Sequence, residues 1–214
     1  MTKSKIISIS IVLFSFIVAL VVYGYMPNIM DGHWNAQGIM DGQISKFWGV
    51  FLIPIINFFI LLMFLIIPRI DPLKENIKKF KKYFDFFLII TLFFLNYIYI
   101  LTLIWNLGHR FNMIQVTMPG FAILWYVCGV LVKNTERNWF IGIRTPWTLM
   151  DDQVWRKTHD LAGTAFKISA LLVIVGMIFD SMAILFVIIP PIIFMSLLMF
   201  YSYFIYRRIN QLKR

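Results

Sequence analysis

The chain has 214 residues, of which 60% are hydrophobic, and it carries a formal net charge of +10 at pH 7. A soluble domain of this length cannot bury so many apolar side chains, so the composition excludes a soluble protein and indicates one compact membrane bundle. The positive charge is also typical of nucleic-acid binding. In a membrane protein, however, it marks basic residues beside the spans, and we expect no direct contact with nucleic acid.

Six apolar runs along the chain are long enough to cross a bilayer, which takes about 20 residues. The runs cover residues 6–26, 47–67, 86–107, 111–132, 161–179 and 182–206. The first run is too long for the apolar core of a signal peptide, and no small-residue cleavage site follows it, so we expect it to remain as a span. The sequence therefore predicts an all-α, polytopic integral membrane protein with six transmembrane helices.

The spans divide the chain into three regions. Residues 1–67 form an N-terminal helical hairpin around a polar loop, 27–46. Residues 68–85 form a basic loop, and residues 86–214 hold four helices together with a second polar loop, 133–160. We expect the two polar loops to carry whatever function is specific to this protein, because the rest of the sequence is typical of membrane helices in general.

The distribution of Lys and Arg between the spans predicts the orientation. Nearly all of them lie in the termini and in the loops 68–85 and 133–160, whereas the other side has only Lys46 and Arg110. The C-terminal ones are Arg207, Arg208, Lys213 and Arg214. Because loops rich in Lys and Arg stay in the cytoplasm, we expect a multi-pass protein of the cell membrane with both termini cytoplasmic and loop 27–46 outside.

The outer loop, 27–46, is predicted to be compact. It has three glycines, two of them in Asp-Gly pairs, and these favour tight turns. His33 has Asp31 and Asp41 nearby, but zinc or copper would need more nitrogen or sulfur ligands, so we expect a hydrogen-bonded His33 and no metal. The loop either grips an extracellular ligand or has a purely structural role. The candidate ligand contacts are His33, Trp34, Asn35 and Asp41.

The inner loop, 133–160, is unusually rich in aromatic residues for a connector. Its residues 148–151, Thr-Leu-Met-Asp, fit the Ser/Thr-x-x-acid pattern of a helix start, so we expect a helix capped by Thr148. On that helix Trp155 and His159 are four residues apart and share a face.

Seven residues of this segment are candidates for a surface that contacts a cytoplasmic partner. They are Arg144, Thr145, Pro146, Trp147, Trp155, Arg156 and His159. We expect Arg144 to pair with Asp152 or Glu136, or to bind a lipid phosphate. The alternative is that these residues only fix the fold of the loop and its depth at the membrane interface, where Trp and Arg act as anchors.

We expect no enzymatic activity and no cofactor. His159, Asp160 and Arg144 are residue types that serve as general acid, base and clamp. However, the chain has no nucleophile motif, no zinc-binding His-Glu-x-x-His motif and no pair of carboxylates placed for a cleft.

Polar residues within the spans give little support to transport. Asn57, Asn96 and Asn106 are expected to form hydrogen bonds across helices. A transporter would favour paired charges near the midplane or broken helices in matched halves, and Pro190 and Pro191 have no counterpart. A small transporter or a membrane enzyme of unknown substrate stays the alternative class.

Two segments carry a resemblance to a known family. Residues 138–163 contain Phe-Ile-Gly-Ile-Arg-Thr-Pro-Trp-Thr-Leu and then Val-Trp-Arg-Lys-Thr-His-x-Leu-Ala-Gly, and residues 27–46 contain His-Trp-Asn followed by Gly and Asp-Gly. With the six spans, they resemble the SdpI-like family, the membrane immunity proteins for a sporulation-delaying peptide toxin of bacteria. The first segment resembles the family's signature loop and helix, and the second its N-terminal extracytoplasmic module.

The resemblance implies a function that composition and spacing do not. Such proteins protect the cell from a secreted, membrane-active peptide, and they signal by holding a cytoplasmic repressor at the membrane when toxin is present. The partners implied are membrane lipids, a peptide toxin at the outer face and a cytoplasmic repressor protein. The outer loop would then meet the toxin, and the inner loop with the basic loop 68–85 would present a changed surface to the repressor.

Overall fold

The computed structural model describes residues 2–211, without the side chain of Asp180. Lys213 and Arg214, which contribute to the predicted orientation, lie outside the described residues. Within them, six helices are long and apolar enough to cross a membrane, which confirms the predicted polytopic all-α architecture. These helices are α1 (Lys3–Val22), α2 (Lys46–Ile70), α4 (Lys81–Asn106), α5 (Met113–Lys133), α7 (Asp152–Gly176) and α8 (Ala183–Gln211).

Shorter elements connect the membrane helices. They are the 3-10 turns η1 (Tyr23–Tyr25) and η2 (Asp180–Met182), the strands β1 (Ile29–Trp34) and β2 (Met40–Ser45), and the helices α3 (Lys74–Lys79) and α6 (Pro146–Met150). The basic loop 68–85 therefore holds α3 and the first turn of α4. The polar loop 133–160 holds α6 and the beginning of α7.

Two of the membrane helices begin well before their apolar runs. Helix α4 begins at Lys81 rather than near 86, and α7 begins at Asp152 rather than near 161. Hydropathy marks only the part of a helix that can lie in lipid, whereas the helix itself begins where a cap satisfies its first backbone N–H groups. The charged first turns of both helices thus extend beyond the apolar runs, although Phe84 of α4 and Val154 and Trp155 of α7 are buried in the bundle.

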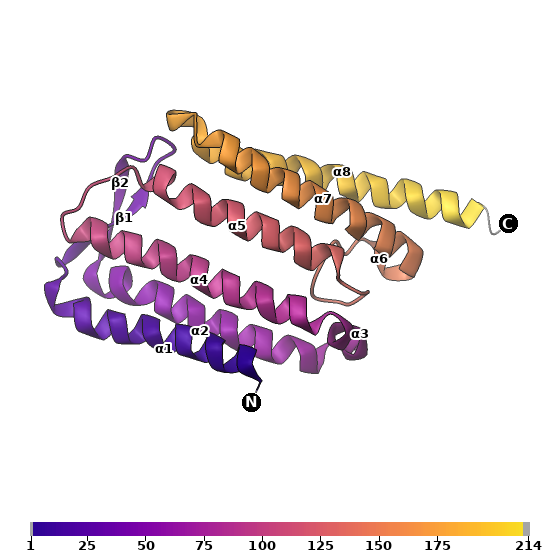
Figure 1. Ribbon diagram of the computed structural model, residues 1–214, viewed down its shortest axis with the longest axis horizontal. Helices are drawn as coiled ribbons and strands as arrows, with labels where there is room; N and C mark the ends of the chain where they lie inside the picture. The colour runs from indigo at the N-terminus through magenta and orange to yellow at the C-terminus, as the bar shows by residue number, and fades with distance from the viewer. Residues whose placement is uncertain (1, 212–214) are drawn as a thin grey trace.

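The bundle consists of two groups of three helices. Helices α1, α2 and α4 pack on one another, as do α5, α7 and α8, and the contact of α4 with α5 joins the two groups (Figure 1). The β1–β2 hairpin lies at one end of the bundle. Helices α3 and α6 and both ends of the described chain lie at the opposite end (Figure 1). The two polar loops are therefore separated by the full length of the bundle.

Close approach of α5 and α7 depends on two glycines. A Cβ atom added to Gly129 would lie 2.7 Å from the carbonyl oxygen of Gly163, and one added to Gly163 would lie 2.6 Å from Lys133 Cβ. In lipid there is no hydrophobic driving force for apolar helix faces to associate. Small residues therefore stabilise helix pairs by letting the backbones approach closely, which increases dispersion energy. Gly163 lies one turn after His159, so this packing also holds the inner end of α7 in place.

Polar side chains separate two apolar layers between α1, α2 and α4. Ser15, Asn57 and Asn96 are buried and lie on the same helix faces as the residues of both layers. The cross-helix hydrogen bonds predicted for the three asparagines are not formed within residues 2–211. Asn106 bonds instead to the backbone of Asp31 in β1 and to Thr102 of its own helix. Asn96 donates to Leu92 of its own helix, and the Asn57 amide has no protein partner among residues 2–211. Sequence places these amides in the core, but only the packing decides whether a partner faces them.

Candidate functional site

The outer loop folds as an antiparallel β-hairpin, which confirms that it is compact. Its turn is closed by Asn35, whose Oδ1 accepts hydrogen bonds from the backbone N–H groups of Gln37 and Ile39, both at 3.0 Å. Gly38 in this turn has φ of 75°, a value that favours glycine. The two Asp-Gly pairs, which were expected in turns, lie within the paired strands β1 and β2.

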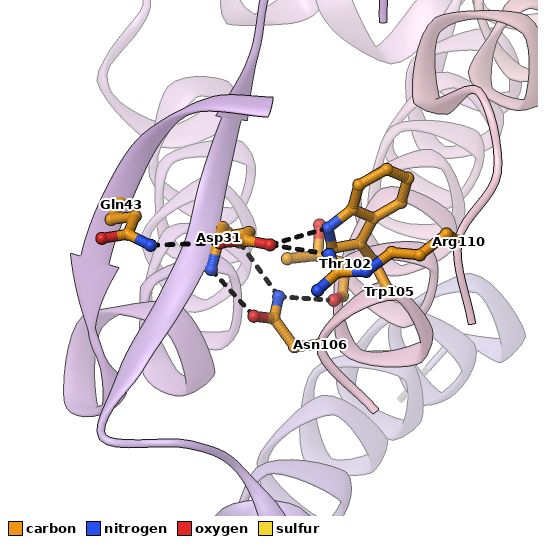
Figure 2. Close-up of polar contacts among 6 residues, drawn as sticks. All are labelled: Asp31, Gln43, Thr102, Trp105, Asn106 and Arg110. Atoms are coloured by element: carbon orange, nitrogen blue, oxygen red, sulfur yellow. Dashed lines mark hydrogen bonds and ion pairs between the residues drawn. The ribbon is translucent and has the colours of Figure 1, made fainter. Parts of the chain in front are cut away.

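A buried carboxylate fastens the hairpin to the end of α4 (Figure 2). Oδ2 of Asp31 accepts hydrogen bonds from Trp105 Nε1 at 2.9 Å and from Arg110 Nη1 at 2.7 Å. Gln43 Nε2 lies 3.5 Å from Oδ1. The Asn106 side chain accepts from the backbone N–H of Asp31 and donates to its carbonyl oxygen, at 2.8 and 3.0 Å. We call these five residues the Asp31 lock.

The electrostatics of the Asp31 lock favour the ionised carboxylate. Burial raises the pKa of Asp31, but the hydrogen bonds from Arg110, Trp105 and Gln43 together outweigh burial, so the pKa lies below its ordinary value. The Arg110 guanidinium also lies 4.8 Å from the centre of the Trp105 ring. Sequence analysis missed this lock. The signal available was that Arg110 and Asp31 are among the few charged residues expected on the outer side.

The four predicted outer contacts divide into exposed and structural residues. His33 Nδ1 lies 2.5 Å from Asp41 Oδ1, and the two side chains are 71% and 43% exposed. Trp34 is half-buried and packs edge-on against Trp105, with ring centres 5.5 Å apart, while Asn35 is engaged in the turn. His33 and Asp41 thus face outward, whereas Trp34 and Asn35 hold the hairpin together. Among the described residues, no third metal-ligating side chain joins His33 and Asp41.

The inner loop contains two helix caps instead of the predicted one. The backbone N–H of Thr148 donates to Thr145 Oγ1 at 3.2 Å, and the backbone N–H of Thr145 donates to Thr148 Oγ1 at 2.9 Å, which caps α6. Asp151 then caps α7 by accepting from the N–H groups of Gln153 and Val154. The prediction that Thr148 caps the long helix is wrong, because a proline after Thr145 starts a separate short helix.

His159 is buried and holds the inner loop by its ring nitrogens. Nε2 accepts a hydrogen bond from the backbone N–H of Ile143 at 2.9 Å, so the proton is on Nδ1, which donates to the Trp155 carbonyl at 2.8 Å. The rings of His159 and Trp155 stack with centres 3.9 Å apart, which confirms that they share a face. Gly142, with φ of 112°, passes so close that an added Cβ would lie 2.4 Å from Nε2. The imidazole is therefore a structural acceptor.

Arg144 does not form either ion pair expected for it. Its Nη1 donates to the Trp139 carbonyl at 2.7 Å. Asp152 pairs instead with Arg137, whose Nε lies 2.9 Å from Oδ1. Within residues 2–211, no hydrogen bond joins Arg144 to His159 or Asp160, so the residue types of an acid, a base and a clamp do not form one site.

The two inner loops form a single structural unit. Asp71 Oδ2 accepts from the backbone N–H of Trp139 at 3.0 Å, and Asn76 Nδ2 donates to the Arg137 carbonyl at 2.8 Å. Asp71 is buried, so the link between the end of α2 and the polar loop 133–160 lies in the interior of the protein. A change in the packing of α2 would therefore reach the signature loop directly.

The seven predicted inner residues also divide by exposure. Arg144, Pro146 and Arg156 are exposed, and Trp147 is half-buried against Tyr203 with ring centres 5.2 Å apart. The buried members are Thr145, Trp155 and His159. The exposed apolar residues Trp139 and Met150 extend the same surface, and sequence analysis did not single them out.

Comparisons with known proteins match both polar loops. Residues 134–203 match the SdpI/YfhL protein family, and residues 10–58 match a Domain of unknown function (DUF1648). The chain is 27% identical over 209 residues to Immunity protein SdpI of Bacillus subtilis (strain 168), an alignment that covers 97% of this chain and 98% of that protein. No solved structure matches the chain. The resemblance to the SdpI-like family is thereby confirmed.

Proposed function

We propose that this chain, which resembles the SdpI-like family along nearly its whole length, is an immunity protein that protects the cell from a secreted, membrane-active peptide toxin. The observation that carries this proposal is the end-to-end alignment with an immunity protein, which includes the outer hairpin, the inner loop and all six membrane helices. A membrane-active peptide acts where it enters the bilayer, so a protein embedded in the same bilayer is placed to intercept it.

The outer hairpin is the surface that we propose meets the toxin. Its docking by the Asp31 lock keeps it rigid, so little conformational entropy is lost when it binds a partner. Its exposed side chains combine the polar pair His33 and Asp41 with the apolar residues Ile29 and Ile39. A mixed surface of this kind suits a peptide that is itself partly apolar. In the orientation predicted from the basic residues, this surface lies outside the cell.

The inner loops are the surface that we propose presents a signal to a cytoplasmic repressor. Arg144, Pro146 and Arg156 are exposed there beside Trp139. Asp71, the C-cap of α2, joins this surface to the end of the helix that begins directly after the hairpin, and Asn76 joins it to α3. Toxin binding that shifts α2 would therefore change the inner surface, provided that toxin has different affinities for the two arrangements. We propose no enzymatic step, because His159 is buried as a backbone acceptor.

Toxin challenge of a sensitive bacterium tests the immunity function. Cells that express this chain are exposed to a sporulation-delaying-type peptide, and survival and membrane potential are recorded at a verified membrane level of the protein. We expect both to be preserved. Unprotected cells at a normal membrane level would contradict immunity against this toxin.

A pair of variants tests the role of the hairpin surface. We expect His33→Ala with Asp41→Ala to lower protection at least tenfold without changing the membrane level, because both side chains are exposed and neither is part of the Asp31 lock. Gln37→Ala, on the same hairpin and exposed, is the matched control and should protect normally. Full protection by the double variant would reject the proposed contact while leaving the immunity function standing.

A further inference from the structure

A partly enclosed cavity lies between α1, α2 and α4, among the first turns of α1 and α4 and the last turns of α2. The cavity therefore lies at the ends of three helices that are apolar enough to cross a membrane. Its volume is about 160 Å³. It contains none of the residues of the outer hairpin or the signature loop.

The mouth of the cavity has an excess of positive charge. Lys5, Arg69 and Lys81 line it together with a single acidic residue, Asp85. Asp85 is already engaged, because it pairs with Lys81 and accepts a hydrogen bond from Ser4 at 2.7 Å. Lys5 and Arg69 form no ion pair with any described residue. The cavity therefore presents two uncompensated cations to whatever enters it.

A buried hydroxyl also faces this cavity without a partner. Ser8 is 1% exposed, and its Oγ has no hydrogen-bond partner in the part of the chain that the structure describes. Most serines in membrane helices satisfy their hydroxyl on the carbonyl one turn earlier, as Ser15 does on Val12 in the same helix. An unsatisfied donor beside two cations is suited to an oxygen of an anion.

Deeper in the cavity the lining becomes apolar. Leu61 and Leu88, which belong to the buried core between the helices, form its floor, and the partly exposed Phe64 and Leu65 form its apolar wall. A free phosphate ion gains nothing from such a wall. A phospholipid places its phosphate at the level of helix ends and its acyl chain beside apolar side chains, and basic pockets between membrane helices commonly bind anionic headgroups in this way.

We propose that this cavity is a binding site for an anionic phospholipid of the leaflet on the side of the chain termini. Lys5 and Arg69 contact the phosphate, Ser8 donates a hydrogen bond to one of its oxygens, and the acyl chain leaves the cavity along Phe64 and Leu65. The bound lipid would tie the start of α1 to the end of α2. The site shares Arg69 and Lys81 with the basic loop 68–85, which belongs to the proposed repressor surface, and no residue with the outer hairpin. Lipid binding by the purified chain therefore tests the site without toxin or repressor.

Lipid binding by the purified, full-length chain in neutral detergent tests this site. Native mass spectrometry measures retention of phosphatidylglycerol and of phosphatidylcholine, and inorganic phosphate in large excess is the competitor. We expect phosphatidylglycerol to be retained in preference. Lys5→Gln with Arg69→Gln should weaken its binding about thirtyfold, since each basic residue near a membrane surface contributes roughly a fivefold gain in affinity for anionic lipid.

Two further variants separate a site from general attraction. Lys3→Gln with Lys79→Gln removes the same charge from exposed positions outside the cavity and should retain the lipid normally. Ser8→Ala should weaken retention about fivefold with unchanged thermal stability, and it tests the site even if the charge variant folds poorly.

Three results would overturn the proposal. The first is equal retention of the two lipids. The second is equal weakening by the cavity and control variants. The third is complete displacement of the lipid by inorganic phosphate, which would assign the cavity to a free anion.

Discussion

Replacing Asp31 with alanine should loosen the outer hairpin from α4 while leaving the helices folded. The change removes the acceptor for Trp105 and Arg110, whereas the two backbone hydrogen bonds with Asn106 remain. A buried hydrogen bond to a charged group contributes about 1.5–3 kcal/mol, and Trp105 is buried. The Arg110 side chain is 57% exposed, so solvent screening limits its ion pair to about 0.5 kcal/mol. We expect docking of the hairpin to weaken by about 2–3 kcal/mol.

Hydrogen exchange of the strand amides in lipid nanodiscs measures this change. When opening is fast and reversible, a loss of about 2–3 kcal/mol accelerates exchange by roughly 30- to 150-fold. Amides in the middle of α5 and α7 serve as an internal reference and should not change. Gln43→Ala removes only the 3.5 Å contact and should accelerate exchange by less than about threefold. Exchange in Asp31→Ala within twofold of the unaltered chain would refute the argument that the carboxylate holds the hairpin.

The same lock predicts a direction for pH dependence. The pKa of Asp31 is lower in the docked hairpin than its ordinary value, so the undocked state binds more protons at low pH. The stabilisation is therefore complete above the ordinary value of about 4 and is lost as the pH falls through the lower, docked value. Strand protection should be constant from neutral pH down to about pH 5 and should decline only in stronger acid. A loss of protection near neutral pH would contradict this assignment.

The remaining predictions concern single residues in the inner loop and in the helix bundle. Gly142→Ala should destabilise the inner loop by about 3 kcal/mol, because it forces an unfavourable φ and a clash with His159, whereas Gly24→Ala, with open space around it, should be neutral in a thermal unfolding assay. Asn57→Leu should stabilise the chain by about 1–2 kcal/mol by removing an unpartnered buried amide. Asn106→Leu, in contrast, removes three hydrogen bonds and should lower the melting temperature of the chain. A lower melting temperature for Asn57→Leu would contradict the conclusion that the Asn57 amide has no partner.

Sequence patterns predicted much about the inner loop and little about its contacts. The aromatic segment and the shared face of Trp155 and His159 follow from composition and helical spacing. The hydrogen bond from the Ile143 backbone N–H to the buried His159 could not be predicted, because every residue except proline has a backbone N–H. The same limit applies to the caps, because the Thr-x-x-Asp pattern points to Thr148, whereas the course of the chain places the caps at Thr145 and Asp151.

The six spans and the compact outer loop were determined by the sequence alone. Lipid offers no partner for backbone polar groups, so an apolar run of sufficient length has to become a helix, and this is a local property that can be counted along the chain. The Asp31 lock joins residues up to 79 positions apart, and the cavity at Lys5 and Arg69 joins three helices. Hydrogen bonds and ion pairs depend on distances in space, which hydropathy does not record. For that reason only the tertiary structure decided which polar residues hold the fold and which are free to bind a partner.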